Sequence, residues 1–226
     1  MKNYFKNRKI LEDGNVYSKN MEHDACGVGL IASTEGKKSR KVVEYGINAL
    51  KAVFHRGAVD ADGKTGDGAG IHLEIPSDFF AEKIEITGHQ HDGSDICVGM
   101  IFLPRNNYEA QENVRTLVES ELTKSNFNIY GWRQVPVNTK VLGEKANFTR
   151  PEITQVLFKN NNKSLKGKDL ERKLYESRRK IEKEAIKNAI EGFYICSLSS
   201  KSIIYKGMFL AESIADFYTD LKDERF

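Results

Sequence analysis

Residues 24–32 have the sequence DACGVGLIA, and the composition of the chain changes abruptly at Cys26. Before this point, residues 1–25 are polar and show no clear period. After it, small residues followed by an apolar run predict a buried strand. The sequence therefore divides into a leader and a folded part that begins at Cys26.

A cysteine directly after such a leader can act as a nucleophile once the bond between residues 25 and 26 is cut. The new α-amino group has a pKa of about 7.7–8.0, so near neutral pH it can accept the thiol proton without a histidine. Gly27 and Gly29 beside the thiol leave room for a carbonyl substrate. A cysteine at the start of a buried strand can equally be a packing residue, and the pattern alone leaves both interpretations open.

A second informative segment follows a predicted helix at 39–54, whose N-cap would be Ser39. Residues 60–70 have the sequence DADGKTGDGAG, which excludes a helix interior because glycine is costly there. The aspartates lack the full spacing of a calcium loop, and the glycines lack that of a nucleotide-binding loop. We therefore predict a tight loop that forms the wall of a pocket.

Downstream, the apolar pattern changes between strand and helix periods. Strands are predicted at 71–75, 96–103, 128–135, 153–158, 193–197 and 202–206, and helices at 108–123 and 169–190. Pro76 predicts a turn, and residues 88–95 predict a polar loop. With no internal repeat and mostly antiparallel strands, the pattern favours an α+β fold.

The composition is that of an ordinary globular chain of 226 residues, with 39% hydrophobic and 30% charged residues and a mean hydropathy of −0.52. No apolar stretch has the length of a membrane helix or a signal peptide. The formal net charge of +3 is mixed along the sequence and argues against nucleic acid as a partner. We expect a cytoplasmic protein with no membrane partner.

The cysteines are odd in number and widely spaced, at Cys26, Cys97 and Cys196. This usage predicts neither a disulfide framework nor a zinc site, and it suits a reducing compartment. Cys97 and Cys196 lie in apolar strand-like runs, so we expect both of them in the core.

Several distinctive motifs occur once each along the chain. In order they are DACGVG at 24–29, HRGA at 55–58, DGKTGDGAG at 62–70 and GWRQVPV at 131–137. RPEI at 150–153, FYICSLS at 193–199, YKGM at 205–208 and DERF at 223–226 continue the series. Together they resemble the glutaminase domain of the glutamate synthase large chain, a class II glutamine amidotransferase. That resemblance implies the αββα sandwich of the N-terminal nucleophile (Ntn) hydrolases.

The resemblance implies that residues 1–25 are a propeptide and that residues 26–226 are the N-terminal part of the amidotransferase domain. The Cys26 thiolate would attack the side-chain amide of glutamine, release ammonia and form a glutamyl thioester that water cleaves. Arg56 and Gly57, and the loop containing Gly66, Asp67 and Gly68, match segments that shape the region around the nucleophile. They are the candidates for the substrate pocket.

In the family the ammonia passes through a tunnel to a flavin site, where it converts 2-oxoglutarate to glutamate. The resemblance therefore implies FMN and an iron–sulfur cluster for the full-length enzyme, with no cofactor or metal in this segment. The expected partners are glutamine, the rest of the large chain and its small subunit.

The family also carries an arginine for the glutamine carboxylate, an Asn-Gly oxyanion pair and an acidic residue for the substrate amino group. None follows Phe226, so we expect the C-terminal half of the domain to be missing and chain 1–226 alone to be inactive or to need a complementary chain. Two alternatives stay open. One is a class II amidotransferase with another ammonia acceptor, and the other is a non-catalytic fragment or split half.

Overall fold

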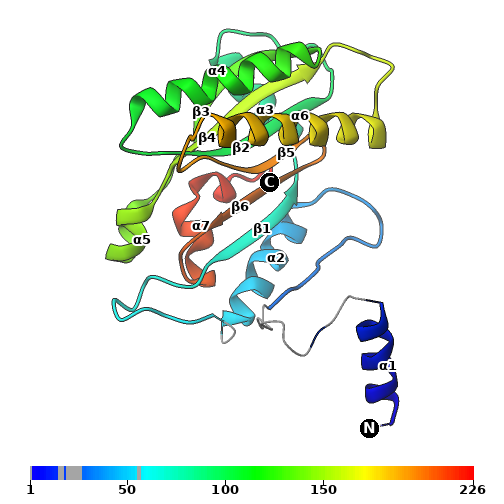
Figure 1. The fold of residues 1–226 in the computed structure, drawn as a ribbon, viewed down its shortest axis with the longest axis vertical. Helices are drawn as coiled ribbons and strands as arrows, with labels where there is room; N and C mark the ends of the chain where they lie inside the picture. Colours follow the sequence, from blue (N-terminus) through cyan, green and yellow to red (C-terminus); the bar gives the residue numbers. More distant parts are fainter. Residues whose placement is uncertain (1, 15–17, 19–26, 55–56) are drawn as a thin grey trace.

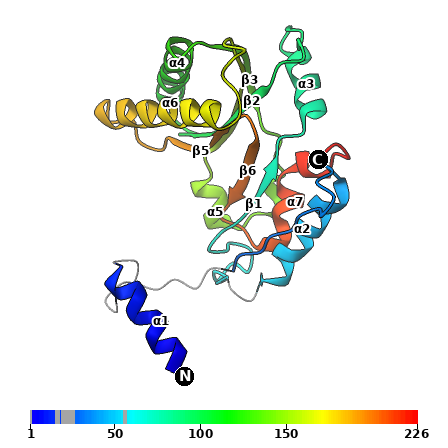
Figure 2. The same ribbon diagram turned by 90° about the vertical axis from the view of Figure 1, so that its right-hand side faces the viewer.

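The computed structural model describes residues 2–14, 18, 27–54 and 57–226. Its elements form successive layers of helix, sheet, sheet and helix (Figures 1 and 2). Helices α4 (Tyr108–Lys124) and α6 (Gly167–Lys187) cover a four-stranded sheet, and α2 (Arg40–Ala52) with α7 (Ile214–Phe217) covers a two-stranded sheet. The predicted α+β class and its layered sandwich are therefore confirmed.

The larger sheet has the strand order β3-β4-β2-β5, and all of its pairs are antiparallel. The smaller sheet is the antiparallel pair β1 and β6. The strands are β1 (Ala69–Glu74), β2 (Ile96–Leu103), β3 (Phe127–Gln134), β4 (Glu152–Asn160), β5 (Tyr194–Ser199) and β6 (Ser202–Gly207). Each lies within a few residues of its predicted range, because each predicted run is apolar or alternates with period two.

Strand β2 shows how the layers share one core. Its side chains alternate, so Cys97 and Ile101 face α4 and α6, whereas Val98 and Met100 face the smaller sheet. All four side chains are fully buried. A strand covered on both faces needs apolar residues at every position, which explains the continuous apolar run in the sequence.

Helices α2 and α4 begin at side-chain caps. Ser39 accepts a hydrogen bond from the amide of Lys41, as predicted, and Asn107 accepts one from the amide of Ala110. The helix α6 carries ion pairs along its outer face, for example Arg178 with Glu182. No described helix combines the length and the hydrophobicity that a membrane span requires.

Four of the described α-helices were not predicted from the sequence. Helix α1 (Lys2–Asp13) lies in the leader, which has no clear apolar period, and α5 (Glu144–Thr149) and α7 are short. Helix α3 (Ser77–Ile86) begins directly after Pro76, where only a turn was expected. Proline suits the start of a helix, and the buried side chains Phe79, Phe80 and Ile84 attach α3 to the core.

The strand predicted from Cys26 onward is wrong for residues 27–32, which the structure describes without strand pairing. Val28 and Leu30 are each 89% exposed. Residues 27–33 instead line an open groove of about 840 Å³ together with α2 and β1. A strand needs backbone hydrogen bonds to a neighbouring strand. Among the described residues β1 pairs only with β6, so residues 27–32 have no strand partner there. Cys26 itself lies outside the described residues.

A buried ion pair joins the two sheets to the segment after α7. Arg133 of β3 donates two hydrogen bonds to the carboxylate of Asp220, at 2.8 and 2.6 Å, and one to Gln155 of β4 at 2.7 Å. The hydroxyl of Tyr205, on β6, donates to the same carboxylate at 3.1 Å. Burial and the Asp220 charge raise the pKa of Tyr205, so this hydroxyl stays protonated and available as a donor.

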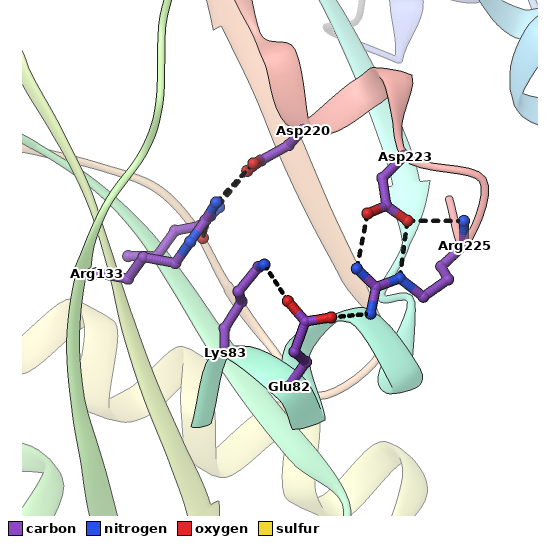
Figure 3. A network of polar contacts seen from close by, with 7 residues as sticks. Glu82, Lys83, Arg133, Asp220, Asp223 and Arg225 are labelled. Carbon is purple, nitrogen blue, oxygen red and sulfur yellow. Dashed lines mark hydrogen bonds and ion pairs between the residues drawn. The ribbon is translucent and has the colours of Figure 1, made fainter. Parts of the chain in front are cut away.

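A second polar network lies beside the first, and Figure 3 shows both. Arg225 pairs with Asp223 at 2.7 Å and with Glu82 of α3 at 2.5 Å. The guanidinium groups of Arg133 and Arg225 both lie over the ring of Phe79, at 5.3 and 5.1 Å from its centroid. The two networks thus meet on α3, which ties the C-terminal segment to the sandwich.

We predict that Asp220→Asn destabilises the chain by about 3–5 kcal/mol, because it leaves the Arg133 charge buried without its counter-ion. The side chains of Arg133 and Asp220 are only 14% and 3% exposed. The free energy of unfolding in urea measures the loss. Lys222→Gln is the control, because its pair with Asp216 is 58% and 60% exposed and contributes less than about 1 kcal/mol. Equal losses in both variants would contradict the assignment.

Candidate functional site

The glycine- and aspartate-rich segment folds back on itself as a short hairpin. Val59 and Gly66 form an isolated antiparallel bridge. Between them, the amide of Asp60 donates to the carbonyl of Thr65 at 2.8 Å. The predicted tight loop is therefore confirmed.

The aspartates of this hairpin accept hydrogen bonds from its own backbone. Asp62 accepts from the hydroxyl of Thr65 at 2.6 Å and from the amides of Thr65 and Lys64 at 2.7 and 2.9 Å. These bonds, the Thr65 hydroxyl first, lower the pKa of Asp62 to about 2. Asp67 accepts from the amide of Ala58 at 2.8 Å. The aspartates thus hold the shape of the loop.

Helix α5 supports the hairpin from outside. The amide of Ala146 donates to the hydroxyl of Thr65 at 3.3 Å, and Lys145 pairs with Asp60 at 2.8 Å. This pair lowers the pKa of Asp60 and raises that of Lys145. A side chain at Gly143, before α5, would overlap the Asp62 carboxylate. The available signal in the sequence was Gly143 followed by Glu144, because an acidic residue is favourable in the first turn of a helix.

Alternate glycines let the loop backbone pack directly on its neighbour. A Cβ atom at Gly66 would lie 2.9 Å from the carbonyl oxygen of Phe209, and one at Gly70 would lie 2.8 Å from the Cβ of Lys206. Gly68 has a φ of +129°, which glycine adopts most easily. Glycine occurs at every second position, at Gly66, Gly68 and Gly70, because these positions face the segment 206–210.

An open pocket of about 870 Å³ lies between the hairpin, the end of α2 and the segment after β6. It is lined by Gly27, Leu50, Val53, Phe54, Gly57, Ala58, Val59, Gly66, Asp67, Gly68, Ala69, Phe209, Leu210, Ala211 and Glu212. Four of the residues predicted for the substrate pocket, Gly57, Gly66, Asp67 and Gly68, thus lie in one wall. Gly27, the next residue after Cys26, lines the same pocket.

Two predicted site residues, Cys26 and Arg56, lie outside the described residues, so their roles stay predictions. The residues Phe209–Glu212 were not predicted to line the pocket. Gly207 was the available signal, because a Cβ atom there would lie 2.5 Å from the ring of Phe209. This glycine lets the chain turn back over the hairpin directly after β6.

The other two cysteines are core residues, as predicted. Cys97 faces α4 and α6, and Cys196 faces the smaller sheet. Burial raises the pKa of the Cys97 thiol and raises that of Cys196 to about 11. Since the thiolate is the reactive form, both are poor nucleophiles.

No three histidine, cysteine or acidic side chains gather into a possible metal site within the part of the chain that the structure describes. That FMN and an iron–sulfur cluster bind elsewhere in a longer enzyme stays a prediction.

The family model for class-II glutamine amidotransferases matches residues 26–226. The chain is 55% identical, over 97% of its length, to the glutamate synthase [NADPH] large chain of Azospirillum brasilense. It is 39% identical over 89% to ferredoxin-dependent glutamate synthase 2 of Synechocystis sp., and 38% identical over 91% to the chloroplastic ferredoxin-dependent glutamate synthase of Spinacia oleracea. The matched region spans 14%, 13% and 13% of these relatives.

We predict that Gly66→Ala destabilises the chain by about 1–3 kcal/mol, because the new methyl group would press on the backbone of Phe209. Urea unfolding measures the change. Gly29→Ala is the matched control, since a Cβ atom there meets nothing within 4 Å. The control should be neutral or slightly stabilising, because alanine restricts the unfolded chain. A neutral Gly66 variant would show that the close packing is not required.

The depressed pKa of Asp62 predicts an acid-sensitive hairpin. A carboxyl group whose pKa falls from 3.8 to about 2 on folding stabilises the folded state above pH 3.8, and this stabilisation is lost as the pH falls toward 2. Asp62→Asn should therefore lower the thermal unfolding midpoint at about pH 7, and the difference from wild type should shrink between pH 3.8 and 2. Glu191→Gln, which removes one negative charge at an exposed side chain, is the matched control. A pH-independent difference would contradict the role of the charge.

Proposed function

Because this chain belongs to the class-II glutamine amidotransferases, we propose that it forms the glutaminase part of a glutamate synthase. The observation that carries the proposal is the convergence of Gly27, Gly57 and Gly66–Gly68 on one pocket. These segments lie far apart in sequence, and one of them directly follows the cysteine at which the family match begins. Similarity to proteins named glutamate synthase supports a glutamate synthase over other class-II amidotransferases.

In the proposed reaction, Cys26 is the nucleophile and its own α-amino group is the base. Removal of the propeptide 1–25 creates this amino group, which accepts the thiol proton. The thiolate adds to the side-chain carbonyl carbon of glutamine, and the C–N bond breaks with release of ammonia. Water then cleaves the glutamyl thioester, which yields glutamate and restores the thiol.

The described wall supports this chemistry by its shape. Gly66 and Gly68 let the hairpin pack directly on the segment 206–210, and this packing sets the shape of the wall that the substrate would meet. Asp67 accepts a hydrogen bond from the amide of Ala58, which helps to order the wall. We assign Arg56, Gly57, Gly66, Asp67 and Gly68 to the substrate pocket.

The proposal extends to the longer enzyme. The released ammonia would serve the formation of glutamate from 2-oxoglutarate at an FMN site, with an iron–sulfur cluster, in the rest of the large chain and with its small subunit. The two described cysteines are unpaired, which suits a reducing cytoplasm.

The test uses the complete natural protein. We expect Cys26→Ala to lower glutamine-dependent glutamate synthesis by at least about 10⁴-fold, because the nucleophile is lost. Ammonia-dependent synthesis should remain, since it bypasses the glutaminase site. Cys196→Ala, at a buried thiol away from the pocket, is the control and should keep glutamine use. Unchanged glutamine use in the Cys26 variant would overturn the proposal.

Chemical labelling gives an independent readout of the same assignment. Among the three cysteines of residues 1–226, iodoacetamide at neutral pH should modify Cys26 first, because burial raises the thiol pKa of Cys97 and Cys196. Peptide mass spectrometry locates the label and also reads the N-terminus. A native protein that begins at Met1, or that is labelled first at Cys97 or Cys196, would contradict the mechanism.

A further inference from the structure

Two arginines leave the larger sheet at the same end. Arg105 follows β2 and Arg150 precedes β4, and the antiparallel register pairs Leu103 of β2 with Glu152 of β4. Both guanidinium groups reach one residue of α5. Arg105 Nη1 donates to the carbonyl of Asn147 at 2.9 Å, and Arg150 Nε donates to the side-chain oxygen of Asn147 at 3.4 Å.

Neither of these guanidinium groups forms an ion pair with a described residue. The described ion pairs of arginine involve Arg8, Arg40, Arg115, Arg133, Arg178, Arg179 and Arg225 only. Arg105 uses its terminal nitrogens on the carbonyls of Asn147 and Phe148, which caps the end of α5. Arg150 donates a hydrogen bond only through Nε, so its two terminal nitrogens form no hydrogen bond with a described residue.

The arrangement carries an energetic cost. Burial lowers the pKa of Arg150, and the neighbouring charge of Arg105 lowers it further, whereas Glu152 opposes this change only as the weakest of the three effects. Capping α5 requires one arginine, and Arg105 already does so. The second guanidinium is therefore held close to a like charge with its donors open, which is the geometry that binds a carboxylate in a bidentate manner.

Two exposed aromatic residues lie close to the pair along the chain. Phe148 is 81% exposed, and its carbonyl accepts from Arg105 at 3.3 Å. Tyr108 is 79% exposed and begins α4, three residues after Arg105. Arginine, tyrosine and phenylalanine are the residues enriched at the energetic centres of protein interfaces. The aromatic side chains favour a protein segment over a small anion, which would gain nothing from them.

We propose that Arg105, Tyr108, Phe148 and Arg150 form a docking surface for an acidic segment of a partner protein. A carboxylate of that segment binds the open donors of Arg150, and an apolar side chain beside it packs on Phe148. Arg105 supplies the second positive charge and fixes the end of α5. This surface is distinct from the pocket lined by Gly66 and Gly68, so it does not depend on the proposed glutaminase reaction.

The test measures binding of a fluorescein-labelled peptide, GEEFEELEEG, to the complete natural protein by fluorescence anisotropy at low salt. We expect saturable binding that weakens as salt rises. Arg150→Gln should weaken it by at least about fivefold, and Phe148→Ala by at least about threefold. Arg172→Gln, at an exposed arginine of α6, removes the same charge elsewhere and should change the affinity by less than about twofold.

Any of the following results would overturn the proposal. Absent binding, or equal weakening by Arg150→Gln and Arg172→Gln, would mean that the pair is not a specific site. Binding of the matched peptide with glutamine at every glutamate position would exclude carboxylate recognition. If inorganic phosphate at about 10 mM displaces the peptide while sodium chloride of equal ionic strength does not, and Phe148→Ala has no effect, the site takes a small anion. Phe148 is exposed, so its variant folds even if Arg150→Gln does not.

Discussion

The ion pair between Arg133 and Asp220 is the constraint on which the rest of the sandwich depends. Both groups are buried, so each is tolerable only in the presence of the other. Their partners come from the larger sheet through Gln155 and from the smaller one through Tyr205. The pair therefore fixes how the two sheets face each other and where the segment after α7 crosses them. Because α7 follows directly on the residues Phe209–Glu212, the same constraint helps to position one wall of the pocket.

The pocket wall itself is built from backbone instead of large side chains. Its hairpin is held internally by Asp62 and externally by α5, and its glycines allow the loop to pack on Phe209 without an intervening side chain. A wall of this kind is rigid because its polar groups are already paired. Its backbone also packs closely, since a Cβ atom at Gly66 would press on the backbone of Phe209. Rigidity and close backbone approach are both properties of a site that positions a small polar substrate.

Local patterns in the sequence predicted what local physics determines. The apolar run of β2 and the Ser39 cap of α2 can both be recognised from near neighbours in the chain. Non-local contacts decided the rest. Val28 and Leu30 were expected inside a strand, yet whether they are buried depends on a partner edge that no local pattern reveals. Helix α3 was missed because Phe79 and Phe80 bury adjacent positions, which breaks the regular helical stripe. The pairing of Arg133 with a residue 87 positions away left no signal at all.

The same reasoning limits which groups can perform chemistry in the pocket. The carboxylate of Asp62 accepts hydrogen bonds from the hairpin that lower its pKa to about 2, so it is a weak base. Cys97 and Cys196 are buried in the two cores and hold their protons. The hairpin and the cores thus supply shape, and the reactive group has to come from another segment that reaches the pocket. Gly27 lines the pocket and directly follows Cys26 in the chain, and this position supports the proposal that Cys26 is the nucleophile.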